Sequence, residues 1–91
     1  MIFEWDSTKA RANALKHGVR FREASSVFRD SLATTFPDPS HSRHEERFVT
    51  VGISTAGRIL VVAHTDRAHA TRLISARPAT PRERRFYEEN Q

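Results

Sequence analysis

The sequence predicts an α+β fold with a mainly antiparallel sheet, built as one domain over residues 1–91 in the order β-α-α-β-β-β-β-α. Three observations lead to this prediction. Two segments with apolar side chains at helical spacing lie near the N-terminus. Three consecutive runs of strand length follow, joined by linkers so short that neighbouring strands must run antiparallel. A segment with strong helix-start signals closes the chain.

A short strand and a capped helix open the chain. Residues 2–5 are rich in β-forming side chains and predict the strand. Asp6 or Ser7 can cap the helix that follows over residues 8–17. Gly18 ends that helix, because glycine readily adopts the positive φ of a helix C-cap.

A second helix and a second strand come next. In residues 21–28 the apolar side chains fall on one helical stripe. Helices this short are not stable alone, so both must pack on a sheet. Residues 32–36 predict a strand that Pro37 ends, because proline cannot donate to a ladder. The polar residues 37–46 read as a loop.

Three further strands are predicted over residues 47–54, 58–65 and 71–77. The first and the last of them alternate between apolar and polar side chains, which is typical of strands with one solvated face. The middle strand is apolar on both faces, which is typical of a central strand. Together they predict a meander.

The last helix has the clearest start signals. Residues 80–83, Thr-Pro-Arg-Glu, form a capping box with proline at the first helical position. The helix is predicted over residues 81–89. Phe86 is its main apolar anchor, so we expect the helix to be loosely docked.

The composition excludes several classes of protein. The chain has no cysteine, which excludes a disulfide framework, a thiolate zinc site and a cysteine nucleophile. No apolar run approaches the roughly 20 residues that span a bilayer. The first residues lack the basic and apolar segments of a signal peptide. We therefore expect a cytoplasmic protein without a membrane partner.

The charge balance favours a phosphate-bearing partner. The net charge is +4, and only Lys9 and Lys16 among the 15 basic residues are lysines. Residues 1–46 are neutral overall, whereas residues 47–91 carry the whole excess as arginines. The planar guanidinium fork grips phosphate and stacks on bases, so this half suggests nucleic acid. A GC-rich genome would give the same arginine bias.

Two sets of histidines are candidates for chemistry. His64 ends the most apolar strand beside Asp66, so it is either a general base or a buried, hydrogen-bonded side chain. His41 and His44 precede two glutamates in a polar loop. No third and fourth ligand of metal-site spacing is evident, so we expect neither a metal nor another cofactor.

Two arginines of the last predicted strand are candidates for phosphate contact. Arg77 comes just before the last helix, near backbone N–H groups that favour phosphate. The alternative is a structural ion pair of Arg77 with Glu46 or Asp66. Arg72 is five residues earlier, so the two face opposite sides of a regular strand and line one groove only if a bulge intervenes.

The last helix offers three more candidates. Arg82 and Arg85 share a face and could bind RNA, or they are solvated and paired with acidic residues of the same helix. Tyr87 could stack on a base or act as an acid. Alternatively, Tyr87 packs beside Phe86.

A series of short motifs resembles the BrnT family, toxins of type II toxin–antitoxin systems. In chain order the motifs are Phe3-Glu4-Trp5-Asp6, Lys16-His17-Gly18-Val19, Glu23-Ala24, Val27-Phe28, Phe36-Pro37-Asp38, Glu45-Glu46-Arg47-Phe48, His64-Thr65-Asp66-Arg67, Ile74-Ser75-Ala76-Arg77, Ala79-Thr80 and Glu83-Arg84-Arg85-Phe86-Tyr87-Glu88. The resemblance covers about residues 2 to 89. Each motif is weak alone, but their order and spacing together are specific.

The resemblance implies a fold like that of RelE-type toxins and a metal-independent endoribonuclease that blocks translation. It also implies neutralisation by a BrnA-like antitoxin, whose DNA-binding region represses the shared operon. The RNA substrate could be ribosome-associated, and no DNA binding by this chain alone is expected. The alternative is a non-catalytic relative that binds RNA or a partner.

The resemblance also implies the site residues. The expected catalytic residues are Arg77, Arg67, His64, Glu46 and Tyr87. The expected RNA-binding residues are Arg72, Arg82 and Arg85, which come from the arginine pattern of the last strand and helix. RNA supplies its own nucleophile, the 2′-hydroxyl, so arginine forks that offset charge on the phosphorane suffice without a metal. Pro78 departs from the family, where a basic residue is expected.

Overall fold

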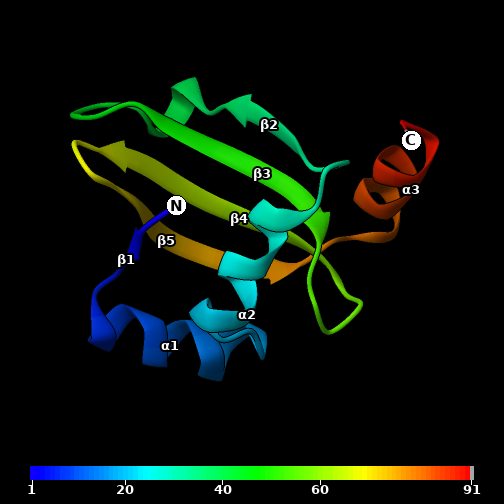
Figure 1. Cartoon of the computed structure of the whole chain (residues 1–91), viewed down its shortest axis with the longest axis horizontal. Helices are drawn as coiled ribbons and strands as arrows, with labels where there is room; N and C mark the ends of the chain where they lie inside the picture. The colour runs from blue at the N-terminus through cyan, green and yellow to red at the C-terminus, as the bar shows by residue number, and fades with distance from the viewer. Residues whose placement is uncertain (91) are drawn as a thin grey trace.

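The computed structural model describes residues 1–90. Over these residues, helices α1 and α2 lie against one face of a five-stranded sheet, and helix α3 lies at one end of the molecule (Figure 1). The α+β class and the predicted element order are confirmed. The elements are β1 (Phe3–Glu4), α1 (Ser7–His17), α2 (Phe21–Ser26), β2 (Thr34–Pro37), β3 (Arg47–Ile53), β4 (Ile59–Arg67), β5 (Ala70–Pro78) and α3 (Pro81–Glu89).

The sheet has the strand order β1-β5-β4-β3-β2, with β4 at its centre as predicted. It is mixed, which corrects the expectation of a mainly antiparallel sheet. The meander pairs antiparallel, but β1 pairs parallel with β5, with Phe3 opposite Thr71 and Glu4 opposite Arg72. A two-residue strand carries no pattern in the sequence that selects its partner, so this pairing was not foreseen.

Helix α1 has the predicted caps and one unforeseen anchor. Asp6 accepts a hydrogen bond from the Lys9 amide at 2.8 Å, and Gly18 takes the left-handed conformation with φ 68°. The buried Asn13 side chain donates to the carbonyl of Ala76 at 2.8 Å and accepts from its amide at 3.0 Å. This pair of bonds fixes the helix against β5.

Helix α2 is shorter than predicted, because its last turn tightens into a 3₁₀ turn at Val27–Arg29. The Ser26 hydroxyl donates to the carbonyl of Glu23 at 2.6 Å, a side-chain bond that competes with regular helix. Together the two helices bury one cluster against the sheet, formed by Val19, Phe21, Ala24, Val27, Leu60, Val62, Leu73 and Ala76.

A bulge in β5 changes which way its arginines face. Ala63 pairs with Ser75 whereas the next residue, His64, pairs with Leu73, so one extra residue is inserted in β5. Arg72 and Arg77 therefore lie on the same face of the sheet, the one opposite α1 and α2. We call this the open face.

Helix α3 covers one end of the open face. Its Tyr87 is 5% exposed and packs with Val51, Val61 and Ala79, whereas Phe86 is 41% exposed. The prediction that Phe86 is the apolar anchor was therefore wrong, because Tyr87 anchors the helix. The apolar surface beyond α3 stays open. No helix among residues 1–90 has the length and apolar character needed to cross a bilayer.

Candidate functional site

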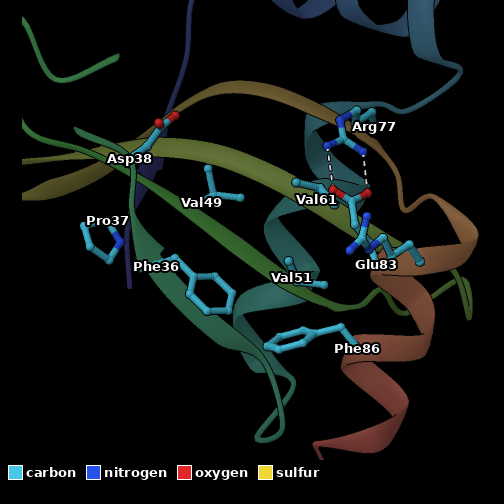
Figure 2. Close-up of a pocket in the computed structure, with 10 residues that line it drawn as sticks. Phe36, Pro37, Asp38, Val49, Val51, Val61, Arg77, Glu83 and Phe86 are labelled. Atoms are coloured by element: carbon cyan, nitrogen blue, oxygen red, sulfur yellow. Dashed lines mark hydrogen bonds and ion pairs between the residues drawn. The ribbon is translucent and has the colours of Figure 1, made fainter. Parts of the chain in front are cut away.

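The open face carries a groove between β2 and α3 (Figure 2). Its volume is about 560 Å³, and it is lined by Phe36, Pro37, Asp38, Val49, Val51, Val61, Arg77, Arg82, Glu83 and Phe86. A smaller hollow of about 280 Å³ shares Asp38, Val49, Val61 and Arg77 with it. That hollow continues to Arg47, His41 and Ser75. The two hollows adjoin along the sheet, and Arg77 lines both of them. We call the two together the path.

Edge strand β2 forms one wall of the groove. Pro37 is the last residue of this strand, opposite Phe48 of β3, whereas the sequence predicted that the strand stops before it. Because the next amide, Asp38, donates to the Arg47 carbonyl at 2.8 Å, the Pro37 nitrogen points away from the sheet. A proline costs no ladder bond there.

Arg77 and Glu83 form a bidentate pair in the groove. Arg77 Nη1 and Nη2 donate to the two carboxylate oxygens of Glu83 at 2.7 and 2.8 Å. Glu83 Oε1 also accepts from the Thr80 amide at 2.8 Å, which completes the predicted capping box. The Arg77 hydrogen bonds outweigh the effect of burial and lower the pKa of Glu83 to about 2. The hydrogen bonds to Glu83 in turn raise the pKa of Arg77.

Other charged side chains line the path on both sides of Arg77. Arg82 and Arg47 form no ion pair within residues 1–90. On the opposite wall, His41 Nδ1 lies 3.0 Å from Asp38 Oδ2. The groove therefore presents arginine donors on several elements and one carboxylate–imidazole pair.

An aromatic pair lies at the α3 end of the groove, where Figure 2 shows the two rings beside each other. Phe36 comes from β2 and Phe86 from α3, and their ring centroids are 5.6 Å apart with a tilt of 51°. A groove with apolar floor, aromatic end and arginine walls suits a ligand that carries both flat rings and phosphate.

Comparison with known proteins assigns the family. A family model described as the ribonuclease toxin BrnT of type II toxin–antitoxin systems matches residues 5–83. The chain belongs to the BrnT family. The crystal structure of the Brucella abortus ribonuclease toxin BrnT matches with a TM-score of 0.69 and 24% identity, over 88% of this chain and 99% of that chain. That match shows the BrnT fold. Among curated proteins, none matches this chain.

The groove brings together only some of the residues expected from the BrnT resemblance. Arg77 and Arg82 line it. Arg85 is exposed on α3 but does not line it. Arg72 shares the open face but is bound 3.1 Å from Glu4 on β1, outside the groove.

Arg67 and Glu46 lie outside the groove. Arg67 ends β4 at the hairpin to β5, which lies at the opposite end of the sheet from α3 (Figure 1), and it is 3.4 Å from Glu45. The Glu46 carbonyl accepts from the Thr65 hydroxyl at 2.7 Å, and its side chain is exposed. The alternative ion pairs for Arg77 are not formed, since Glu83 is its partner.

His64 lies on the opposite face of the sheet from Arg77. It is 5% exposed, with its ring packed against Phe28 and Phe48. Its Nε2 lies 2.7 Å from the hydroxyl of Thr50, and its Nδ1 has no hydrogen-bond partner within residues 1–90. Burial lowers the pKa of His64, so the ring is neutral near pH 7. This is the buried-histidine alternative rather than a groove-facing base.

Tyr87 does not line the groove either. Its hydroxyl donates to Asp30 Oδ2 at 2.5 Å. Burial and this hydrogen bond raise the pKa of Tyr87 to about 12. Burial would raise the pKa of Asp30, but hydrogen bonds from the amide of Ile53, from Tyr87 and from the amide of Leu32 hold it below its usual value. The arrangement suits an anchor for α3 better than a proton donor.

Several groove residues were not singled out from the sequence. They are Phe36, Asp38 and Arg47, with His41 considered only as a metal ligand. The alternation of Arg47, Val49 and Val51 signals one shared strand face, but nothing local shows that this face stays uncovered. Within residues 1–90, no group of three His, Cys, Asp or Glu side chains could hold a metal ion.

Proposed function

We propose that this BrnT-family chain is an endoribonuclease and that its RNA lies in the groove of the open face. The observation that carries the proposal is the guanidinium of Arg77, which Glu83 anchors and which lines both hollows of an arginine-lined path. End-on pairing with Glu83 uses Nη1 and Nη2, and the Nε–H edge has no partner within residues 1–90. A phosphate can bind that edge without breaking the pair.

The chemistry we propose is transfer within the RNA backbone. The 2′-hydroxyl oxygen attacks the adjacent phosphorus, and the bond from phosphorus to the 5′-oxygen breaks. The products are a 2′,3′-cyclic phosphate and a 5′-hydroxyl, with one proton removed from the 2′-oxygen and one given to the 5′-oxygen. Arg77 offsets the charge that builds on the phosphorane. Since RNA supplies the nucleophile and arginine the charge, we expect cleavage without a divalent metal.

The proton transfers are assigned to the pair of His41 and Asp38. The 3.0 Å contact from Nδ1 to the carboxylate orients the imidazole and leaves Nε2 to exchange a proton. Both side chains line the same hollow as Arg77. His64, Glu46 and Tyr87, expected from the resemblance, lie outside the groove and are not given this role.

Membership of the BrnT family supports a proposal for the cellular role. We propose that the chain acts in the cytoplasm as one domain with a RelE-like fold, and that RNA cleavage stops translation. A BrnA-like antitoxin neutralises it by covering the arginine-rich half with acidic and apolar segments. Association would then weaken at high salt. A salt-independent complex would point to an apolar interface instead.

The test of the activity is incubation of the purified chain with bulk RNA in EDTA. We expect RNA fragments that end in 2′,3′-cyclic phosphate. No fragments, with a folded chain shown by circular dichroism, would leave either a ribosome-dependent enzyme or a non-catalytic RNA-binding relative. Translating ribosomes added to the same assay would then separate these two.

A further inference from the structure

The two aromatic side chains at the end of the groove are exposed. Phe36 and Phe86 are 37% and 41% exposed, although their rings contact each other. Neither belongs to the apolar cluster that seats α3, which is formed by Val51, Val61, Ala79 and Tyr87. Two aromatic side chains therefore stay more than a third exposed, outside the buried cluster that seats the helix. Apolar surface rimmed by charged groups marks a binding site.

The neighbours of the pair are arginines. Arg82 lies four residues before Phe86, so both point from the same side of α3, and both line the groove. Arg77 lines the same groove from β5. Aromatic rings beside guanidinium groups match a nucleotide, whose base stacks and whose phosphate takes the arginine donors.

We propose that Phe36 and Phe86 form a stacking site for one unpaired base of the RNA, next to the phosphate bound at Arg77. The inference rests on the proposed ribonuclease function and names its substrate class: single-stranded RNA. The rings are 5.6 Å apart, so the base stacks on the outside of the pair rather than between its members. A base in a duplex has no free face to offer and is excluded.

The test measures binding separately from cleavage. The probe is a short fluorescein-labelled RNA with 2′-O-methyl ribose throughout, which lacks the nucleophile, followed by fluorescence anisotropy. Three forms of the probe are compared. They are a single strand, a fully paired duplex, and a set of single strands that each lack the base at one position. We expect wild type to bind the single strand best, and to lose roughly 5- to 100-fold in affinity at one abasic position.

The variants assign that loss to the aromatic pair. Phe86→Leu and Phe36→Leu keep apolar bulk and remove one aromatic face each, so we expect each to reduce the abasic penalty and the double variant to bind intact and abasic RNA equally. Phe86→Trp restores the difference. Leu15→Ala, at an 85% exposed position on α1, is the matched control and binds like wild type.

The outcomes separate this inference from the proposed function. Leucine variants that keep the full abasic penalty overturn the stacking site, even if the wild type cleaves RNA. Equal binding of single-stranded and paired RNA by the wild type overturns it as well. If the penalty depends on Phe86 but unmodified RNA is never cleaved, the stacking site stands and the ribonuclease function fails.

Discussion

One carboxylate joins the cationic centre of the groove to the start of a helix: Glu83 accepts two hydrogen bonds from Arg77, at 2.7 and 2.8 Å, and a third from the amide of Thr80 at 2.8 Å. The capping box of α3 therefore also orients the guanidinium. Because Pro81 fixes the first turn of the helix, the position of Arg77 depends on backbone geometry as well as on its own rotamer.

Replacing this carboxylate changes stability in a pH-dependent way. At neutral pH, Glu83→Gln is expected to cost roughly 0.5–1 kcal/mol, the upper range for exposed ion pairs, because the contact is bidentate. The pKa of Glu83 falls from 4.5 to about 2 on folding, so its contribution is complete above pH 4.5. This contribution disappears as pH falls to about 2. Urea unfolding of the wild type and the variant between pH 2 and 7 measures the difference in their unfolding free energies. A difference that stays constant with pH contradicts the prediction.

The anchor of α3 gives a second prediction. Tyr87→Phe removes the hydrogen bond to ionised Asp30 and should cost about 1.5–3 kcal/mol in unfolding free energy. The pKa of Tyr87 rises from 10.0 to about 12 on folding, so wild type should lose this stability as pH rises through that interval. The variant should not. If Tyr87 were instead the catalytic acid, the variant would keep its stability and lose most of its cleavage rate.

The proton-transfer pair gives a third prediction. His41→Ala should slow RNA cleavage on the order of 10²-fold or more, because it removes the imidazole that we propose to transfer protons. His44→Ala is the matched control, since it removes an exposed imidazole from the same loop. Equal rates for the two variants would remove His41 from the mechanism.

His64 should affect stability rather than the chemistry. Its pKa is lowered from 6.5 by burial, so the folded chain should lose stability as pH falls below about 6.5, where the unfolded chain takes up the proton first. His64→Gln should lose that decline and keep the pH–rate profile of wild type. A changed profile, with folding intact by circular dichroism, would return His64 to the list of catalytic candidates.

Local sequence signals were enough to predict the helices and strands but not the candidate site. The caps at Asp6, Gly18 and Thr80 act within one helical turn, so the sequence predicts them directly. The parallel pairing of β1 and the contact from Tyr87 to Asp30 join residues 57 or more positions apart, which no local pattern encodes. The hydrophobic pattern therefore predicted a packed sheet without showing which face stays open.

The bulge in β5 had the largest effect on the candidate site. Simple alternation places Arg72 and Arg77 on opposite faces, and the extra residue brings them to the same face. Of the residues expected from the sequence, Arg77 and Arg82 line the groove. The sequence does not separate them from Arg67 and Arg72, whose carboxylate partners lie outside the groove.

The most direct test of the groove as the RNA site compares two arginines in one cleavage assay. Arg77→Ala removes a guanidinium that lines the groove, whereas Arg84→Ala removes an exposed arginine of α3 that does not line it. With RNA in EDTA, we expect Arg77→Ala to lose on the order of 10²-fold or more in rate and Arg84→Ala to cleave like wild type. Equal rates for the two variants, with both folded, would contradict the assignment of the site to the open face.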